Sequence, residues 1–333
     1  MRLFDCTLRD GANVVGNGFD ALLTESIIKN LLSCGIEDIE FGNAKGLGAY
    51  EMQNAEAPLS DLEYLKLAGA YADKGNLGMF LQAKCADRER VRMAAEHGMH
   101  FLRIGIEAGG GEKALPAVAM VKEAGMYCRY SQMKAYICTP EELAEEAAML
   151  EREGVDAITI MDSAGTMFPD EAAAYVSAMA ERVSIPVGFH GHNNLGLSVA
   201  NALAAMEAGA KEIDCGLLGM ARSAGNCATE LAASVLCRKG ILEKTCLFKL
   251  LAYLNKELIP VMEKYSYHTA VTPDALVLGL SGCHSAFFGR FQKVAQEENV
   301  ESYPLIMAVS ERDKSMPTED FIRRMAEMGD RKL

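Results

Sequence analysis

The stretch Leu3-Phe4-Asp5-Cys6-Thr7-Leu8-Arg9-Asp10-Gly11 is a short apolar run that ends in charged residues. Short β-rich runs of this kind, separated by helix-length segments with a 3.6-residue apolar period, recur along the chain. We expect eight strands, at residues 3–8, 36–41, 77–83, 101–106, 127–135, 157–161, 186–190 and 212–217. Eight βα units within about 240 residues indicate a (β/α)₈ barrel, the TIM-barrel fold.

An open, doubly wound parallel sheet is the alternative architecture. It is disfavoured because no Gly-x-Gly-x-x-Gly pattern, typical of dinucleotide-binding folds, follows the first strand. After about residue 240 only helical patterns remain, at residues 242–257, 285–298 and 318–328, with a turn expected at Thr272-Pro273-Asp274. We therefore expect an α/β protein with a barrel domain at residues 1–240 and a small helical domain at residues 241–333, packed on the barrel mouth.

The composition is that of a globular protein, with 333 residues, half of them hydrophobic and 24% charged. Lys and Arg number 33 against 46 Asp and Glu, and the net charge of −13 argues against a nucleic-acid or anionic-membrane partner. The ten cysteines are scattered without a Cys-x-x-Cys pair, which favours reduced thiols over a disulfide or zinc framework. Because we also find no signal peptide or membrane-spanning stretch, we expect a cytoplasmic protein.

Asp10 and the pair His190 and His192 are candidate ligands of a divalent metal. Residues i and i+2 of a strand project from one face, so the two imidazoles can hold one ion side by side. Strands one, seven and eight adjoin when a barrel closes, which brings Asp10 to the same rim. Two histidines and one carboxylate with open coordination positions suit Mn²⁺ or Mg²⁺, with Zn²⁺ or Co²⁺ as alternatives. The competing interpretation is that each histidine only satisfies a buried hydrogen bond.

Three further residues lie at predicted strand ends or in the adjoining loops. Arg9 precedes Asp10, and its guanidinium is expected to stabilise a developing enolate oxygen; a structural salt bridge is the alternative. Ser163 could hold a substrate carboxylate or simply form a turn. Asn226 ends a loop of small residues that permits close approach of a ligand, although it could also cap a helix.

These motifs resemble those of the superfamily of metal-dependent pyruvate aldolases, isopropylmalate synthases and HMG-CoA lyases, the DRE-TIM metallolyases. The resemblance rests on residues 5–11, on His190-Gly191-His192-Asn193, and on the loop from Gly219 to Glu230. Within this group the 4-hydroxy-2-oxovalerate aldolase family is most similar, because the order of its motifs extends to residues 161–165, 195–207 and 278–287.

The resemblance implies a TIM barrel with a small helical domain and metal ligation by Asp10, His190 and His192. It also implies that Arg9 and Ser163 lie near the pyruvyl group of the substrate. By the same resemblance, the side chain of Asn226 approaches or joins the metal shell.

The chain departs from the aldolase family at two positions that bear on proton transfer. Asn13 stands where the family has a catalytic histidine, and an amide cannot act as a base. His284 stands near a family tyrosine, and we expect this imidazole to take over proton transfer; a position at the domain junction is the alternative. Side chains near Asn13, Tyr130, Met133 and His284 are expected to select the aldehyde.

We therefore predict a divalent-metal-dependent lyase that cleaves or forms a carbon–carbon bond in a 4-hydroxy-2-oxo acid through a pyruvate enolate. One alternative is an acyl-CoA-dependent Claisen condensation, as in isopropylmalate or homocitrate synthase. A catalytically silent metal-binding barrel is the other. Because barrels with helical appendages often dimerise, we expect a homo-oligomer. The resemblance also implies, as a partner, an acylating aldehyde dehydrogenase that receives the aldehyde.

Overall fold

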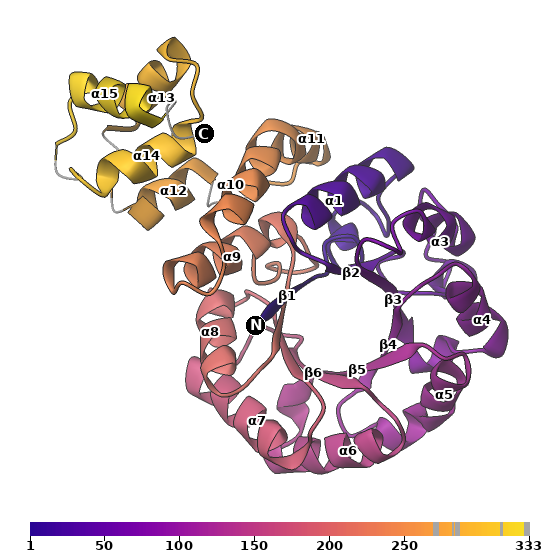
Figure 1. The fold of residues 1–333 in the computed structure, drawn as a ribbon. Coiled ribbons are helices and arrows are strands. Elements are labelled where there is room, and N and C mark those ends of the chain that lie inside the picture. Colours follow the sequence, from indigo (N-terminus) through magenta and orange to yellow (C-terminus); the bar gives the residue numbers. More distant parts are fainter. Residues whose placement is uncertain (269–272, 282, 284–286, 314–315, 330–333) are drawn as a thin grey trace. The chain divides into compact units, whose positions relative to one another are not determined.

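The structure is a computed structural model that describes residues 1–268, 273–281, 283, 287–313 and 316–329. Its centre is a closed barrel of parallel strands in the order β1 to β8 (Figure 1). The strands are β1 (Arg2–Asp5), β2 (Asp38–Phe41), β3 (Asn76–Gln82), β4 (Phe101–Glu107), β5 (Tyr127–Met133), β6 (Ala157–Asp162), β7 (Val187–Gly191) and β8 (Glu212–Cys215). Every predicted strand is present, and the TIM-barrel prediction is confirmed.

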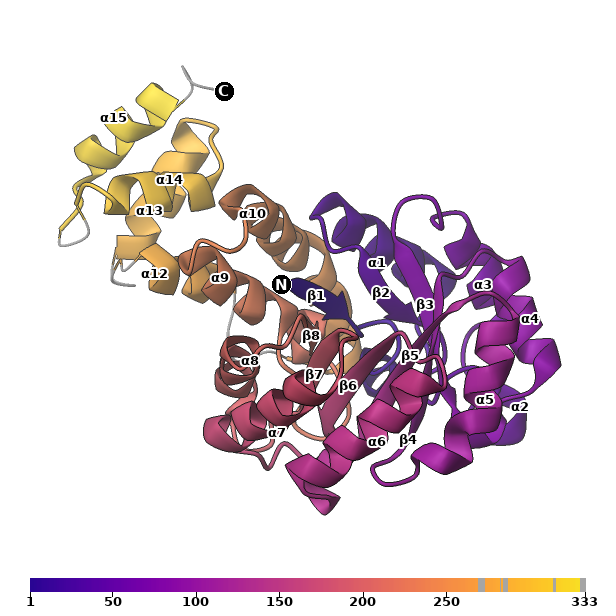
Figure 2. The same cartoon turned by 60° about the horizontal axis from the view of Figure 1, so that its bottom comes forward.

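Helices surround the barrel in alternation with the strands (Figures 1 and 2). They are α1 (Ala21–Ser33), α2 (Ala49–Met52), α3 (Asp61–Gly69), α4 (Arg88–Glu96), α5 (Gly111–Glu123), α6 (Pro140–Arg152), α7 (Pro169–Arg182), α8 (Ser198–Glu207) and α9 (Thr229–Arg238). Helix α6 begins with a capping box: Thr139 accepts from the Glu142 backbone N–H at 3.2 Å, and the Glu142 carboxylate accepts from the Thr139 N–H at 2.8 Å.

The strand register brings the carboxyl ends of β1, β7 and β8 together. Phe4 lies opposite Asp214 across the β1–β8 pair, and Asp214 lies opposite His190 across the β7–β8 pair. Because all strands run in one direction, the residues that follow them gather at one rim of the barrel.

The barrel interior is filled with ion pairs rather than with aliphatic side chains. Arg129 pairs with Glu212, and Arg103, which is 1% exposed, pairs with Asp214. Phe4 lies between the two cations, with guanidinium carbons 4.5 and 4.6 Å from its ring centroid. The charges of these two pairs are therefore matched inside the barrel, which limits the cost of their desolvation.

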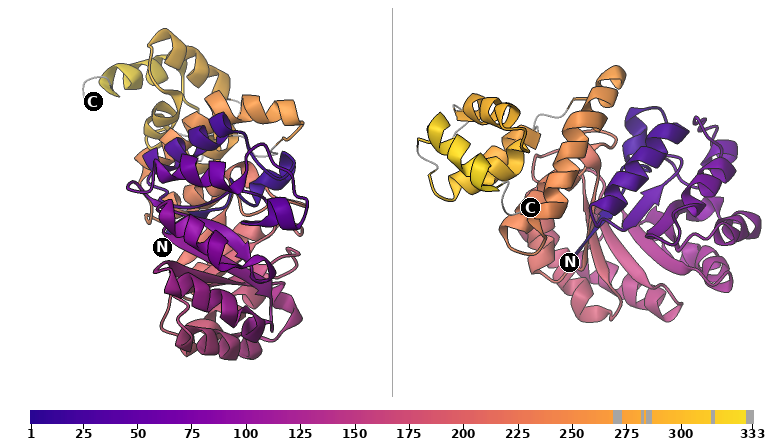
Figure 3. Two further views of the ribbon diagram at one scale, coloured as in Figure 1. Left: turned by 90° about the vertical axis from the view of Figure 1, so that its right-hand side faces the viewer. Right: turned by 45° about the horizontal axis from the view of Figure 1, so that its top comes forward.

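The contacts between residues divide the chain into two compact units, residues 1–232 and 233–333. In the second unit, the elements of the described residues are helical: α10 (Lys244–Tyr253), α11 (Ile259–Met262), α12 (Pro273–Ser281), α13 (Phe288–Glu297), α14 (Ser302–Ser310) and α15 (Glu319–Gly329), joined by short helical turns (Figure 3). The expected turn at Thr272-Pro273-Asp274 is wrong at Pro273, which begins α12, because proline is well suited to the first turn of a helix. The boundary at residue 240 and packing on the barrel mouth stay predictions.

Among the helices of the described residues, none combines the length and the apolar character that a membrane span requires. The ten cysteines form no disulfide among the described residues.

Candidate metal centre

Asp10, His190 and His192 converge at the rim of the barrel. Asp10 Oδ2 lies 3.6 Å from His190 Nε2 and 3.8 Å from His192 Nε2. The two imidazole rings are 5.2 Å apart between centroids, and one ligand atom from each residue lies within 4.8 Å of the other two. All three side chains are buried. The geometry expected from the His-x-His spacing is therefore present.

The pKa values of two of these groups favour the forms that bind a metal. Burial opposes ionisation of Asp10, yet the Arg9 guanidinium and the two imidazoles hold the pKa of its carboxyl far below the usual range. Burial, with the neighbouring His190, lowers the pKa of His192 to about 4. At neutral pH the site thus offers a carboxylate and a neutral imidazole, as cation ligation requires.

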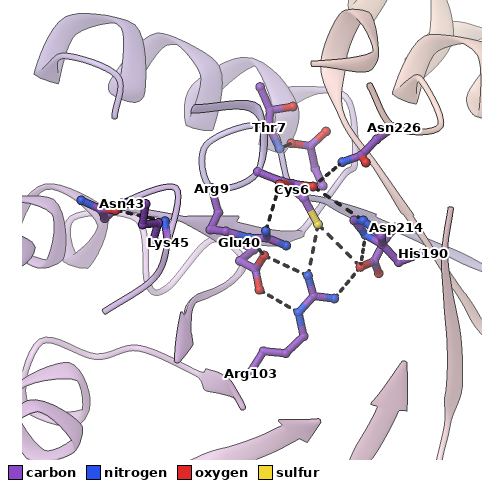
Figure 4. Close-up of polar contacts among 12 residues, drawn as sticks. Cys6, Thr7, Arg9, Glu40, Asn43, Lys45, Arg103, His190, Asp214 and Asn226 are labelled. Atoms are coloured by element: carbon purple, nitrogen blue, oxygen red, sulfur yellow. Dashed lines mark hydrogen bonds and ion pairs between the residues drawn. The ribbon is translucent and has the colours of Figure 1, made fainter. Parts of the chain in front are cut away.

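His190 is oriented by a carboxylate on the adjacent strand. Its Nδ1 lies 3.0 Å from Asp214 Oδ2, an arrangement that assigns the proton to Nδ1 and leaves the Nε2 lone pair facing Asp10. Arg103 bonds both Asp214 and Glu40, and Glu40 also accepts from Arg9 Nε at 2.5 Å (Figure 4). Burial would raise the pKa of Asp214, but the Arg103 guanidinium and His190 hold it low.

Three buried polar atoms beside the candidate ligands have no partner among the described residues. They are His192 Nδ1, Asn226 Oδ1 and Arg9 Nη2. Asn226 Nδ2 donates to Asp10 Oδ2 at 2.9 Å, and Arg9 Nη1 lies 3.1 Å from Asp10 Oδ1. Buried polar atoms normally have partners, so these atoms fit a site that holds an ion and an oxygen-bearing ligand.

One glycine allows the loop after β6 to pack against the segment that carries His192, and another allows the loop after β8 to fold tightly on itself. A Cβ on Gly165 would lie 2.7 Å from His192 O, and one on Gly225 would lie 2.2 Å from Gly219 O. Both have positive φ, at 60° and 87°. Asn226 then forms an isolated antiparallel bridge with His192. Any larger residue at either position would displace these loops.

A cleft of about 370 Å³ opens over the candidate ligands. Its lining includes Arg9, Asn13, Met133 and Ser163, all predicted from the sequence. Asn13 Nδ2 donates to the Asp10 carbonyl at 2.8 Å and lies 3.3 Å from its carboxylate, so it braces this ligand. Ser163 Oγ accepts from a backbone N–H at 2.9 Å and keeps its own proton to donate.

Two other predicted residues are not among those that line the cleft. Tyr130 is fully buried, and its hydroxyl has no partner among the described residues, so it does not itself line the cleft; selection of the aldehyde by side chains near it stays a prediction. A strand residue reaches the barrel rim only near its carboxyl end, and Tyr130 lies in the middle of β5. His284 lies outside the described residues.

The HMGL-like family model matches residues 1–256. The chain belongs to the HMGL-like family. It is 32% identical over 321 residues to the 4-hydroxy-2-oxovalerate aldolase of Chloroflexus aurantiacus, covering 96% of this chain and 93% of that protein. It is 33% identical over 325 residues to that of Thermomicrobium roseum, covering 98% and 90%.

The fold of this HMGL-like protein is also similar to the carboxyl transferase domain of Rhizobium etli pyruvate carboxylase. The TM-score is 0.66 at 18% identity, over 98% of this chain and 60% of that one. The resemblance that we drew from the motifs is confirmed by the family and by these relatives. The expectation of a metal-dependent carbon–carbon lyase is borne out by the curated aldolases.

Sequence reasoning missed the charged residues that support the candidate ligands in this HMGL-like chain. Arg103 interrupts a predicted strand that is otherwise apolar, while Glu40 and Asp214 alternate with apolar residues in predicted strands that hold further acidic residues. A charge inside a buried strand must find a partner, so the sequence could have indicated that these residues are paired, but not with which partner. Lys45, Gln82 and Arg222, which line the cleft, follow or end strands and carried no comparable signal.

Proposed function

We propose that this protein is a divalent-metal-dependent aldolase that cleaves or forms the carbon–carbon bond of a 4-hydroxy-2-oxo acid through a pyruvate enolate. One observation carries the proposal: the ligand atoms of Asp10, His190 and His192 lie within 4.8 Å of one another beneath a cleft that Arg9 also lines. The names of the curated relatives support the same reaction class.

Asp10, His190 and His192 would hold the ion, Mn²⁺ or Mg²⁺ by preference and Zn²⁺ or Co²⁺ as alternatives. The bound ion would act as a Lewis acid toward the carboxylate and keto oxygens of the 2-oxo acid. Arg9 Nη2, which has no partner among the described residues, would donate to the oxygen on which enolate charge develops. Ser163 would donate its hydroxyl proton to the pyruvyl carboxylate, and Asn226 would brace Asp10.

A base must remove the hydroxyl proton when the bond is cleaved. Among the described residues that line the cleft, the only imidazoles are the two candidate ligands, and Asn13 is an amide. We therefore keep the proposal, which rests on the sequence alone, that His284 transfers this proton. Turnover that is unchanged by His284→Phe would exclude it.

Metal removal tests the proposed function. The full-length protein is treated with a chelator, reconstituted with Mn²⁺ or Mg²⁺, and assayed for pyruvate release from several 4-hydroxy-2-oxo acids. We expect release that disappears on chelation and returns with metal. The variant Asp10→Asn should bind less metal and lose most of the activity, because a neutral amide is a weaker ligand.

Asp20→Asn is the matched control, because Asp20 caps α1 away from the cleft and asparagine caps equally well. Undiminished activity after exhaustive chelation would contradict the proposal. So would condensation of acetyl-CoA with a 2-oxo acid and release of free CoA, which is the Claisen reaction.

The proposal extends to the surroundings of the enzyme. We propose a cytoplasmic homo-oligomer that passes its aldehyde to an acylating aldehyde dehydrogenase. The composition supports the location, and the tendency of barrels with helical appendages to dimerise supports the homo-oligomer. The family resemblance alone supports the dehydrogenase partner. Light scattering of the purified protein measures whether it forms a homo-oligomer. The same measurement after addition of the dehydrogenase shows whether the two proteins bind each other.

A further inference from the structure

The cleft above the candidate ligands is cationic, although the whole chain has a net charge of −13. One acidic residue, Asp10, is among the lining residues, against the cations Arg9, Lys45, Lys134 and Arg222. Clefts that concentrate one sign of charge attract ligands of the other sign. The local charge therefore needs an explanation that the overall composition does not supply.

Two of the four cations are already neutralised by protein carboxylates. Arg9 is paired with Glu40 and Asp10, and Lys134 is paired with Glu107. Lys45 and Arg222 are different: within the part of the chain that the structure describes, neither side chain has a hydrogen bond or an ion pair. The Lys45 residue is partly exposed and Arg222 is exposed, so both cations can be reached by a ligand in the cleft.

The backbone holds Lys45 in place. Its N–H donates to Asn43 Oδ1 at 3.0 Å, and its carbonyl accepts from Gln82 Nε2, at the end of β3, at 2.7 Å. Figure 4 shows Asn43 and Lys45 together beside the loop that carries Arg9. The ammonium is thus presented from a fixed loop rather than from a flexible tail.

Arg222 is presented in the same way from the loop after β8. Its carbonyl accepts from the Gly225 N–H at 3.1 Å, and the adjacent Ser223 has a left-handed φ of 58°. Ser223 Oγ also accepts from Asn194 Nδ2 at 2.7 Å, which ties this loop to the one after His192. Two cations without partners are therefore fixed on loops after β2 and β8, on the same cleft.

We propose that Lys45 and Arg222 bind an anionic group, a phosphate or a carboxylate, on the aldehyde half of the substrate. This inference rests on the proposed aldolase function and names its substrate class. In the proposed function the metal and Ser163 would bind the pyruvyl carboxylate, so this group does not account for Lys45 and Arg222. An aldehyde without a charge would leave both of them unpaired in the complex.

The anionic group takes no part in the bond change. In the synthetic direction a methyl proton leaves pyruvate, C3 of the enolate bonds to the aldehyde carbon, and the aldehyde oxygen gains a proton to become the hydroxyl. The phosphate or carboxylate only binds. Its recognition therefore affects which aldehyde is used and leaves enolate formation as a separate, measurable step.

The test compares matched aldehydes with the full-length, metal-loaded protein. Exchange of pyruvate methyl protons with D₂O is measured first, because it reports the enolate without any aldehyde. Aldol addition is then measured with glyceraldehyde 3-phosphate against glyceraldehyde, and with succinic semialdehyde against butanal. We expect kcat/KM to be higher by about tenfold or more for the anionic member of at least one pair. A factor of this size corresponds to the free energy of one charge-assisted hydrogen bond.

Variants assign the preference to these two residues. Lys45→Gln and Arg222→Gln should each reduce the ratio of charged to neutral kcat/KM by roughly tenfold. Lys84→Gln is the matched control. It removes the same positive charge, and Lys84 does not line the cleft although it is only two residues from Gln82, which does. In the unmodified protein the ratio should also fall as the ionic strength rises from about 0.05 M to about 0.5 M.

The outcomes separate the two claims. Methyl exchange without any anionic preference, or a preference that the Lys45 and Arg222 variants keep, would overturn this inference and leave the aldolase intact. Absence of methyl exchange in the metal-loaded protein would overturn the proposed function, and this inference with it.

Discussion

Asp214 connects the candidate metal ligands to the charged interior of the barrel. It contacts His190 Nδ1 on one side and the Arg103 guanidinium on the other. We predict that Asp214→Asn weakens Mn²⁺ binding by about 10–100-fold. The carboxylate orients the His190 imidazole and raises its basicity, and a neutral amide would do neither. Calorimetric titration of the chelated protein with Mn²⁺ measures the effect.

Asp214→Asn also leaves Arg103 with one fewer charged partner, so thermal unfolding is followed in parallel to confirm that the titrated protein is folded. Asp20→Asn serves again as the control. Mn²⁺ affinity equal to that of the unmodified protein would show that Asp214 supports the fold and does not position His190.

The candidate ligands were accessible from the sequence, and Asp214 was not, for a physical reason. His190 and His192 are two residues apart on one strand, so their common face follows from strand geometry alone. The contact of Asp214 with His190 and Arg103 depends on strand register across three strands, which no local pattern encodes. Tyr130 illustrates the same limit, because its depth in the barrel decides whether it reaches the rim.

Helix α6 begins with a reciprocal cap of a kind that local sequence can reveal. The Thr139 hydroxyl accepts from the Glu142 N–H, and proline at the next position fixes the first turn. We predict that Thr139→Ala lowers the free energy of unfolding by about 1 kcal/mol, measured by urea denaturation. Thr139→Ser should keep the cap and serves as the control; equal loss in both variants would rule out the cap as the cause.

The helices that were missed lack such local signals. Helix α14 begins after Glu301 without a side-chain cap, and its residues are mostly apolar, so no amphipathic period marks it. Helix α12 has Pro273 at its start and a glycine inside, and we expected a turn at Thr272-Pro273-Asp274 instead. Both helices depend on packing within the second unit more than on their own residues, and packing is not visible locally.

Stability of the barrel should depend on a buried acid, Glu230. Its carboxylate accepts from the Leu218 N–H at 3.0 Å, while Oε1 has no partner among the described residues. Burial raises the pKa of Glu230 from 4.5 to about 7. Between these values the folded protein binds a proton that the unfolded chain has released, so the free energy of unfolding falls as the pH rises through this window.

We therefore predict that Glu230→Gln flattens the pH dependence of unfolding between about pH 5 and about pH 7, because it removes this titration. Burial also raises the pKa of Asp5, to about 6, and that group keeps part of the slope in the variant. Urea unfolding at several pH values measures the slope. An unchanged slope in Glu230→Gln would assign the dependence to other groups.

The most direct test of the whole account is the position of a bound metal. Crystals of the full-length protein grown with Mn²⁺ would be examined by anomalous diffraction at the manganese edge. The account predicts one strong peak within coordination distance of Asp10, His190 and His192, at the base of the cleft that Arg9 lines. A peak elsewhere, or none at this site in protein that still forms the pyruvate enolate, would contradict it.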